Sequence, residues 1–184
     1  MNQLIGVAGK ARAGKDTFVL GLIEAGYIRA AFADALKQVT AMTAGEPVQN
    51  FTNETLKEEF SESLQMTRRR ALQNVGNMMR SAIHDGIWLQ RVVRDWEASG
   101  RAPTAIADCR YPNEAEAVRA AGGIVVRINR PTLQGLTGDA ATHSSEIPLP
   151  DELVDIEITN DGTVEQLYQN AARVALFARE RAWK

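Results

Sequence analysis

The chain has 184 residues, of which 45% are hydrophobic and 24% are charged, and its formal net charge is −2. This length suits one α/β domain with a sizeable core and a small lid, while the scattered charges argue against a nucleic-acid partner and no apolar stretch approaches the roughly 18 residues of a membrane span. The single cysteine, Cys109, excludes an internal disulfide and a cysteine-rich zinc site, and predicts a small buried side chain in a cytoplasmic protein.

The first predicted element is a strand over residues 4–8, an apolar run that precedes a glycine-rich loop. Helical periodicity begins after Lys15, with apolar side chains expected on the inner face at Phe18, Val19, Leu22 and Ile23. A glycine-rich loop between a strand and a helix lets backbone N–H groups curl around an anion, and the helix dipole adds positive charge. The sequence therefore predicts a phosphate-binding loop.

The spacing of Gly9, Gly14 and Lys15 fits the P-loop pattern, in which the lysine reaches the β- and γ-phosphates of a nucleotide. One position departs from that pattern. A Ser or Thr that holds magnesium normally follows the lysine, whereas here Asp16 follows it and Thr17 comes one step later.

A second strand is predicted over residues 27–32, followed by a helix that runs toward Gly45. Ligands of open α/β sheets gather at the carboxyl ends of the strands, so Phe32, Asp34 and Lys37 are positioned to face a ligand beside the loop. The alternative is an aspartate that caps the helix and a solvated lysine.

The polar region from residue 46 to 67 predicts only a solvated helix over residues 53–59. An amphipathic helix follows, with Leu72, Val75, Met79 and Ile83 at helical spacing. At least one of Arg68, Arg69 and Arg70 should lie beside that stripe and could bind a phosphate through its forked guanidinium, and Gln73 could hydrogen-bond a base edge. In the next helix, Trp88 and Arg91 would suit an aromatic wall beside an anionic ligand, although core packing is the commoner explanation for tryptophans at this spacing.

A third strand, residues 104–107, ends at Asp108. P-loop enzymes place there the carboxylate that holds magnesium, directly or through water, and Arg110 then lies near the phosphate being moved. The run from Asn113 to Glu116 predicts a helix cap.

A fourth strand is expected over residues 124–128. The long segment after it predicts a mobile lid over residues 130–146, with Arg127 and Arg130 at its base. His143 within it is expected to make a polar contact rather than bind a metal. A fifth strand, residues 155–159, and a tight turn precede a C-terminal helix whose inner face is expected to carry Val164, Leu167, Ala171 and Val174.

Taken together, several segments resemble the deoxynucleoside monophosphate kinases of tailed bacteriophages: residues 9–17, 32–37, 108–114, 127–131, 143–146 and 160–163. The resemblance runs from about residue 4 to about residue 170. It implies an α/β P-loop NTPase fold with a central five-stranded parallel sheet flanked by helices. It also implies a single domain, residues 1–184, with a helical monophosphate-binding region over about residues 46–100 and the lid over about residues 130–146.

The resemblance further implies transfer of the γ-phosphoryl group of ATP to a deoxynucleoside monophosphate, with Mg²⁺, to supply DNA precursors for phage replication. With the motifs above, it gives as catalytic residues Lys15, Asp108, Arg110 and Arg130. The residues expected to bind ATP are Gly9, Ala11, Ala13, Gly14, Lys15, Asp16, Thr17, Asn160 and Gly162. Those expected to bind the monophosphate are Phe32, Asp34, Lys37, Arg68, Arg69, Gln73, Trp88, Arg91 and Arg110, and those expected to hold the metal are Asp16 and Asp108.

Two alternatives remain open from the sequence. One is a P-loop kinase for another small phosphorylated acceptor, such as dephospho-coenzyme A or phosphomevalonate. The other is a module that binds ATP only as a switch, against which the pairing of Asp108 with Arg110 argues. Apolar helices without an assigned partner also suggest a homodimer.

Overall fold

The computed structural model describes residues 4–131 and 148–181, which belong to two compact units. The first unit joins the chain up to Ala31 with the chain from Arg94 onward, and the second is Phe32–Val93. The second unit covers most of the predicted helical region but begins earlier in the chain. The predicted lid, apart from Arg130 and Pro131, and with it His143, lies outside the described residues.

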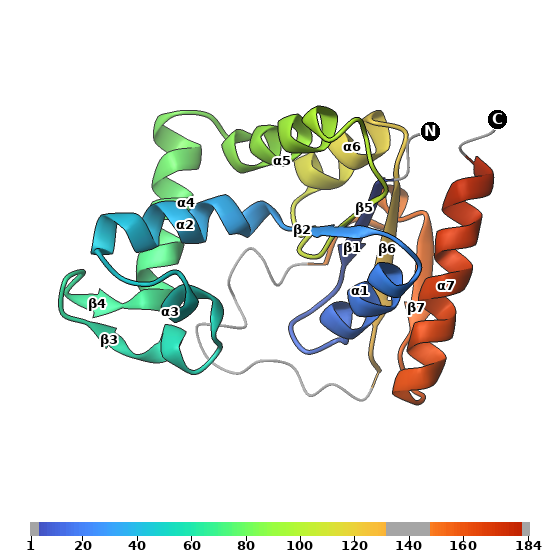
Figure 1. Ribbon diagram of the computed structural model, residues 1–184, viewed down its shortest axis with the longest axis horizontal. Helices are drawn as coiled ribbons and strands as arrows, with labels where there is room; N and C mark the ends of the chain where they lie inside the picture. The colour runs from blue at the N-terminus through green and yellow to red at the C-terminus, as the bar shows by residue number, and fades with distance from the viewer. Residues whose placement is uncertain (1–3, 132–147, 182–184) are drawn as a thin grey trace. The chain divides into compact units, whose positions relative to one another are not determined.

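A five-stranded parallel sheet with the order β2-β5-β1-β6-β7 forms the centre of the first unit (Figure 1). Its strands are β1 (Leu4–Ala8), β2 (Ile28–Ala30), β5 (Thr104–Ile106), β6 (Ile124–Asn129) and β7 (Ile156–Thr159). Every residue of β1 is buried, as expected for a central strand covered on both faces. The predicted parallel sheet is therefore confirmed.

Helices cover both faces of this sheet: α1 (Lys15–Glu24) and α7 (Val164–Arg181) pack together on one face, and α6 (Pro112–Ala120) lies on the other (Figure 1). Helices α1 and α7 approach closely at Gly21, where a Cβ would lie 2.8 Å from the Cβ of Ala171. The predicted inner faces are correct except for Ile23 and Val164, which are 39% and 58% exposed. Val164 lies in the first turn of α7, and Ile23 lies on the outer side of α1.

The second unit contains α2 (Phe32–Ala44), α3 (Gln49–Thr52), a small hairpin of β3 (Phe60–Ser61) and β4 (Met66–Thr67), and α4 (Arg68–Ala82). A further helix, α5 (Ile87–Ala98), begins in this unit and ends in the first. The core of the second unit contains Ala41, Ala44 and Phe51, and Val48, Leu64 and Leu72 pack against them.

Three local predictions in this part of the chain are wrong. Phe32 begins α2 instead of ending a strand. The helix expected over residues 53–59 is only a 3-10 turn at Leu56–Glu58. The Asn53 side chain caps its start by accepting hydrogen bonds from the backbone N–H groups of Thr55 and Leu56, and the chain becomes extended at Glu59, where it enters the β3–β4 hairpin. Ile83 lies beyond the end of α4 and is 63% exposed.

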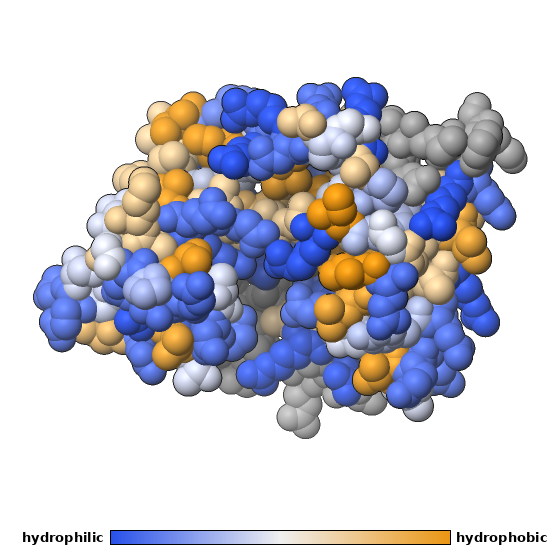
Figure 2. Space-filling model, viewed as in Figure 1, coloured by the Kyte–Doolittle hydropathy of each residue, from blue (hydrophilic) through white to orange (hydrophobic). Residues whose placement is uncertain are grey.

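Exposed hydrophobic side chains gather over α1 on the face shown in Figure 2, where Leu20 is 51% exposed. These exposed side chains do not show what protein surface would cover them, so the homodimer stays a prediction. In the ranges that the structure describes, none of the helices combines the length and the apolar character needed to cross a membrane.

Candidate active site

The loop between β1 and α1 is tightly curled. Gly9 and Gly14 have φ angles of 139° and 101°, and Arg12 also adopts a positive φ of 63°. A Cβ at Gly9 would lie 2.4 Å from the backbone oxygen of Ile128 in β6, so only glycine fits this close approach. Gly14 is the N-cap of α1, whose first N–H groups have no acceptor within the helix. Residues 9–15, which we call the P-loop, thus present the positive end of a helix, as predicted.

Lys15 bends back over this loop. Its ammonium nitrogen donates hydrogen bonds to the carbonyl oxygens of Gly9 and Lys10, each at 2.7 Å. The side chain therefore spans the turn that it follows, and a phosphate bound in the loop would compete for the same ammonium protons.

The segment after β5 lies beside the start of the P-loop. β5 pairs with β1 in parallel register, and the pairing continues past β5 because the backbone N–H of Cys109 donates to the carbonyl of Val7 at 3.1 Å. Asp108, which is half-buried, and Arg110, which is exposed, are the two neighbours of Cys109 in the chain. The structure thus brings together the two motifs that the sequence analysis paired, whereas their catalytic roles stay predictions.

Cys109 itself is buried, with 1% of its surface exposed, as predicted. Burial raises the pKa of its thiol well above the ordinary value, and the carboxylates of Glu114 and Asp108 raise it further. The thiol is therefore protonated at neutral pH and behaves as a small hydrophobe.

Glu114 holds this segment in place. Its buried carboxylate accepts hydrogen bonds from the backbone N–H groups of Arg110 at 2.8 Å and Tyr111 at 3.0 Å. The helix cap expected from Asn113 to Glu116 is therefore displaced by two residues: Tyr111 is the N-cap, and Pro112 is the first residue of α6. This role of Glu114 was not predicted, although a Pro followed two positions later by Glu is a helix-start signal in the sequence.

A cavity of about 340 Å³ opens at this junction. Gly9, Lys10 and Ala13 of the P-loop line it together with Arg110 and Arg130. Within residues 4–131 and 148–181, the side chains of Lys10, Arg110 and Arg130 have no ion-pair partner. The cavity therefore concentrates positive charge where an anionic ligand can enter. Lys10 was not among the predicted site residues, although it belongs to the P-loop motif.

Arg127 also lines this cavity, but its charge is already neutralised. Its guanidinium donates to carboxylate oxygens of Asp151 at 2.6 Å and Glu157 at 3.2 Å, and to the carbonyl of Leu149. These contacts hold the chain before β7 against β6, so Arg127 has a structural task at this edge of the sheet.

A second cavity of about 340 Å³ lies at the start of α7, and the predicted ATP-binding residues Asn160 and Gly162 line it. The start of α7 is a capping box: the Thr163 N–H donates to the Gln166 side chain at 2.8 Å, and the Gln166 N–H donates to the Thr163 hydroxyl at 3.3 Å. Asn160 links this turn to the P-loop, because its side-chain amide donates to the carbonyl of Ala13 at 2.8 Å.

All but one of the predicted monophosphate-binding residues belong to the second unit; Arg110 is the exception. Phe32 and Trp88 are buried, with 2% and 5% of their surfaces exposed. Asp34 and Lys37 form an ion pair at 3.5 Å. Gln73 and Arg91 are exposed.

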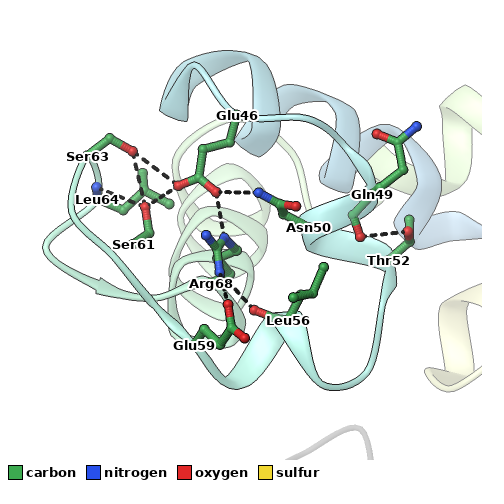
Figure 3. A network of polar contacts seen from close by, with 10 residues as sticks. All are labelled: Glu46, Gln49, Asn50, Thr52, Leu56, Glu59, Ser61, Ser63, Leu64 and Arg68. Atoms are coloured by element: carbon green, nitrogen blue, oxygen red, sulfur yellow. Dashed lines mark hydrogen bonds and ion pairs between the residues drawn. The ribbon is translucent and has the colours of Figure 1, made fainter.

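Arg68 lies within a polar network of the second unit (Figure 3). Its guanidinium donates to the Glu46 carboxylate at 2.5 Å and to the carbonyl of Leu56 at 3.0 Å. The same carboxylate accepts hydrogen bonds from Ser61 and Asn50, which, together with Arg68, lower the pKa of Glu46 to about 2.

Arg69 is engaged in a similar way, since it pairs with Glu54 at 3.3 Å and with Glu58. The guanidinium groups of Arg68 and Arg69 therefore join α4 to the segments before it. Their expected binding of a phosphate stays a prediction, and Arg70 is the exposed member of the three.

Comparison with known proteins gives a family and a fold. A sequence model of the deoxynucleotide monophosphate kinase family matches residues 29–171. The chain is also 29% identical over 185 residues to a protein of Acanthamoeba polyphaga mimivirus provisionally named as a deoxynucleotide monophosphate kinase, an alignment that covers 90% of this chain and 92% of that protein. The matched range begins after the P-loop, so the evidence for that loop is its geometry.

Among solved structures, dephospho-CoA kinase from Campylobacter jejuni is similar with a TM-score of 0.54 at 17% identity, and a protein from Thermus thermophilus with 0.53 at 18%. Both comparisons cover 96% of each chain. At these identities the likeness shows the fold alone, and it confirms the predicted P-loop kinase fold.

Proposed function

Since the chain belongs to the deoxynucleotide monophosphate kinase family, we propose that it transfers the γ-phosphoryl group of ATP to the phosphate of a deoxynucleoside 5′-monophosphate. The observation that carries this proposal is the cavity in which the P-loop meets Arg110 and Arg130. A phosphotransferase needs this combination, a cradle for the donor phosphates beside cations that can neutralise the group in transit.

Catalysis in this proposal is mainly positioning and charge neutralisation. The donor and the acceptor are both anions and repel each other in water, and the transition state spreads negative charge over the moving group. An acceptor phosphate oxygen forms the new bond to the γ-phosphorus while the bond to the β–γ bridging oxygen breaks, and ADP leaves. Lys15 exchanges its two carbonyl partners for phosphate oxygens, and Arg110 and Arg130 neutralise the transferring group.

We also propose that Asp16 and Asp108 hold Mg²⁺ together with phosphate oxygens and water. The described ranges contain no cluster of three or more His, Cys, Asp or Glu side chains, which fits an ion held by one or two carboxylates and its substrate rather than by a dedicated protein cage. When bound, Mg²⁺ supplies positive charge to the phosphates.

The diphosphate product would supply DNA precursors, a role that suits virus replication because the mimivirus relative is virus-encoded. The test is a panel of deoxynucleoside and ribonucleoside monophosphates assayed with Mg-ATP for ADP and diphosphate formed in equal amounts. Dephospho-coenzyme A and phosphomevalonate belong in the same panel. Turnover with either of these and none with a deoxynucleoside monophosphate would replace the proposed acceptor, and ATP binding without any transfer would favour the switch module.

A further inference from the structure

Asn160 makes a contact that connects two distant parts of the chain. Its side-chain nitrogen donates to the carbonyl oxygen of Ala13, 147 residues away in the sequence, at 2.8 Å. The Asn160 backbone is itself fixed, because its N–H donates to the carbonyl of Asn129 at 2.7 Å and so extends the pairing of β6 with β7. The amide thus reaches the P-loop from the edge of the sheet.

The P-loop is shaped to receive this amide. A Cβ at Gly14 would lie 2.4 Å from the Asn160 side-chain nitrogen and 3.2 Å from the side chain of Leu167, so the amide fills the space that glycine leaves. A carbonyl oxygen can only accept a hydrogen bond, and the NH₂ group of Asn160 must therefore face Ala13.

This hydrogen bond also fixes the direction of a backbone donor. The carbonyl of Ala13 and the N–H of Gly14 belong to one planar trans peptide and point in opposite directions. Because the carbonyl is held toward Asn160, the Gly14 N–H points away from Asn160. Within residues 4–131 and 148–181 that N–H has no acceptor, so it is available to a phosphate oxygen.

We propose that Asn160 is a positioning residue for phosphate binding: it acts on the phosphates of the nucleotide through Ala13 and does not contact the base or the ribose. The inference rests on the proposed function only in taking ATP as the ligand of the P-loop. It assigns Asn160 a task different from that of the direct ATP ligand expected from the sequence.

The test compares Mg-ATP with Mg-tripolyphosphate, which has the phosphates but no nucleoside. Calorimetric titration of Asn160→Ala should show both ligands weakened by a similar factor, about tenfold, because the lost hydrogen bond orients a phosphate donor. Asn160→Asp should weaken both further, since it sets a carboxylate against a carbonyl. In the kinase assay, KM for ATP should rise while KM for the acceptor stays unchanged.

Asn74→Ala and Asn74→Asp are the matched controls, because they make the same substitutions at an exposed asparagine of the second unit. The only described side-chain contact of Asn74 is with the Met66 sulfur at 3.5 Å, so both variants should bind the two ligands like wild type. Circular dichroism and thermal unfolding establish that each variant is folded. A folded Asn160→Ala that loses affinity for ATP alone would show direct contact with the nucleoside and overturn the inference, as would wild-type affinity for both ligands.

The result also separates this inference from the proposed function. A wild-type protein that binds ATP but transfers phosphate to no acceptor would remove the proposed function and leave the Asn160 test intact. Failure of the wild-type protein to bind either ligand would overturn both.

Discussion

The backbone N–H of Cys109 donates a hydrogen bond to the carbonyl of Val7 at 3.1 Å. Through this contact the chain after β5 continues to run beside β1 up to the point where the P-loop begins. Asp108 and Arg110 flank the bonded residue, so both are carried to the carboxyl edge of the sheet, where ligands of open α/β sheets bind. The candidate active site is therefore a consequence of two neighbouring parallel strands that end together.

Replacing Lys15 by alanine should abolish phosphoryl transfer and leave the fold intact. Its ammonium donates to the backbone oxygens of Gly9 and Lys10, and we expect kcat/KM to fall by about a thousandfold because a charge next to the transferring group is lost. Lys57→Ala, which removes an ion pair with Glu54 in the second unit, is the matched control and should retain activity. Near-normal turnover in a folded Lys15→Ala would refute the role.

Gly9→Ala should disturb the P-loop more than an alanine at another glycine of positive φ. At Gly9 the added Cβ would lie 2.4 Å from the backbone oxygen of Ile128, whereas at Gly100, with a φ of 74°, it would meet nothing within 4 Å. We expect Gly100→Ala to cost about 1 kcal/mol of unfolding free energy and Gly9→Ala about 3 kcal/mol, with ATP affinity lost only in the latter. Urea unfolding measures the free energy of each variant, and ATP titration measures its affinity. Equal losses of unfolding free energy in the two variants would contradict the close approach of Gly9 to Ile128.

Glu114→Ala should destabilise the protein by about 2 kcal/mol, since two backbone N–H groups at the start of α6 lose their acceptor. Glu114→Gln retains a side-chain oxygen that can accept the same hydrogen bonds, so its loss should be smaller. Urea unfolding compares the two. If the two variants are equally unstable, the carboxylate charge rather than its hydrogen bonds holds the segment.

The second unit should lose stability in acid through Glu46. Its pKa of about 2 in the folded protein lies below the ordinary value of 4.5, so its contribution is complete above pH 4.5 and is lost as the pH falls toward 2. Denaturant unfolding at pH 6, 4 and 3 should show this decline in the wild type and a flatter profile in Glu46→Gln. Glu62, which is exposed, provides the matched control, and Glu62→Gln should keep the wild-type profile.

The sheet and the P-loop could be predicted because their signals are local. Apolar runs, glycines and residues at strand ends determine which segments become parallel strands, and parallel strands bring their carboxyl ends together whatever lies between them. This is why residues as far apart as Gly9 and Arg110 were correctly paired from the sequence.

The features that could not be predicted depend on contacts with residues far away in the sequence, which a local sequence pattern does not indicate. Arg68 donates to Glu46, 22 residues earlier, a partner that its own helix pattern does not indicate, and its expected contact with a phosphate stays a prediction. The helix expected after Asn53 is cut short at Glu59, whose carbonyl accepts a hydrogen bond from the backbone N–H of Arg68 on the far side of the β3–β4 hairpin. Asn160 was expected to bind ATP, and its hydrogen bond to Ala13 joins residues 147 positions apart, a separation that no local pattern covers.

The most direct test of the account is the rate of γ-phosphoryl transfer from Mg-ATP to deoxynucleoside monophosphates by Arg110→Ala. Arg110 lines the cavity beside the P-loop, and the loss of its guanidinium should lower kcat/KM by about a hundredfold. Arg101→Ala removes an exposed arginine that pairs with Glu97 and should retain wild-type activity. The account predicts equal yields of ADP and deoxynucleoside diphosphate from the wild type and this large loss in a folded Arg110→Ala; unchanged kinetics in that variant would contradict it.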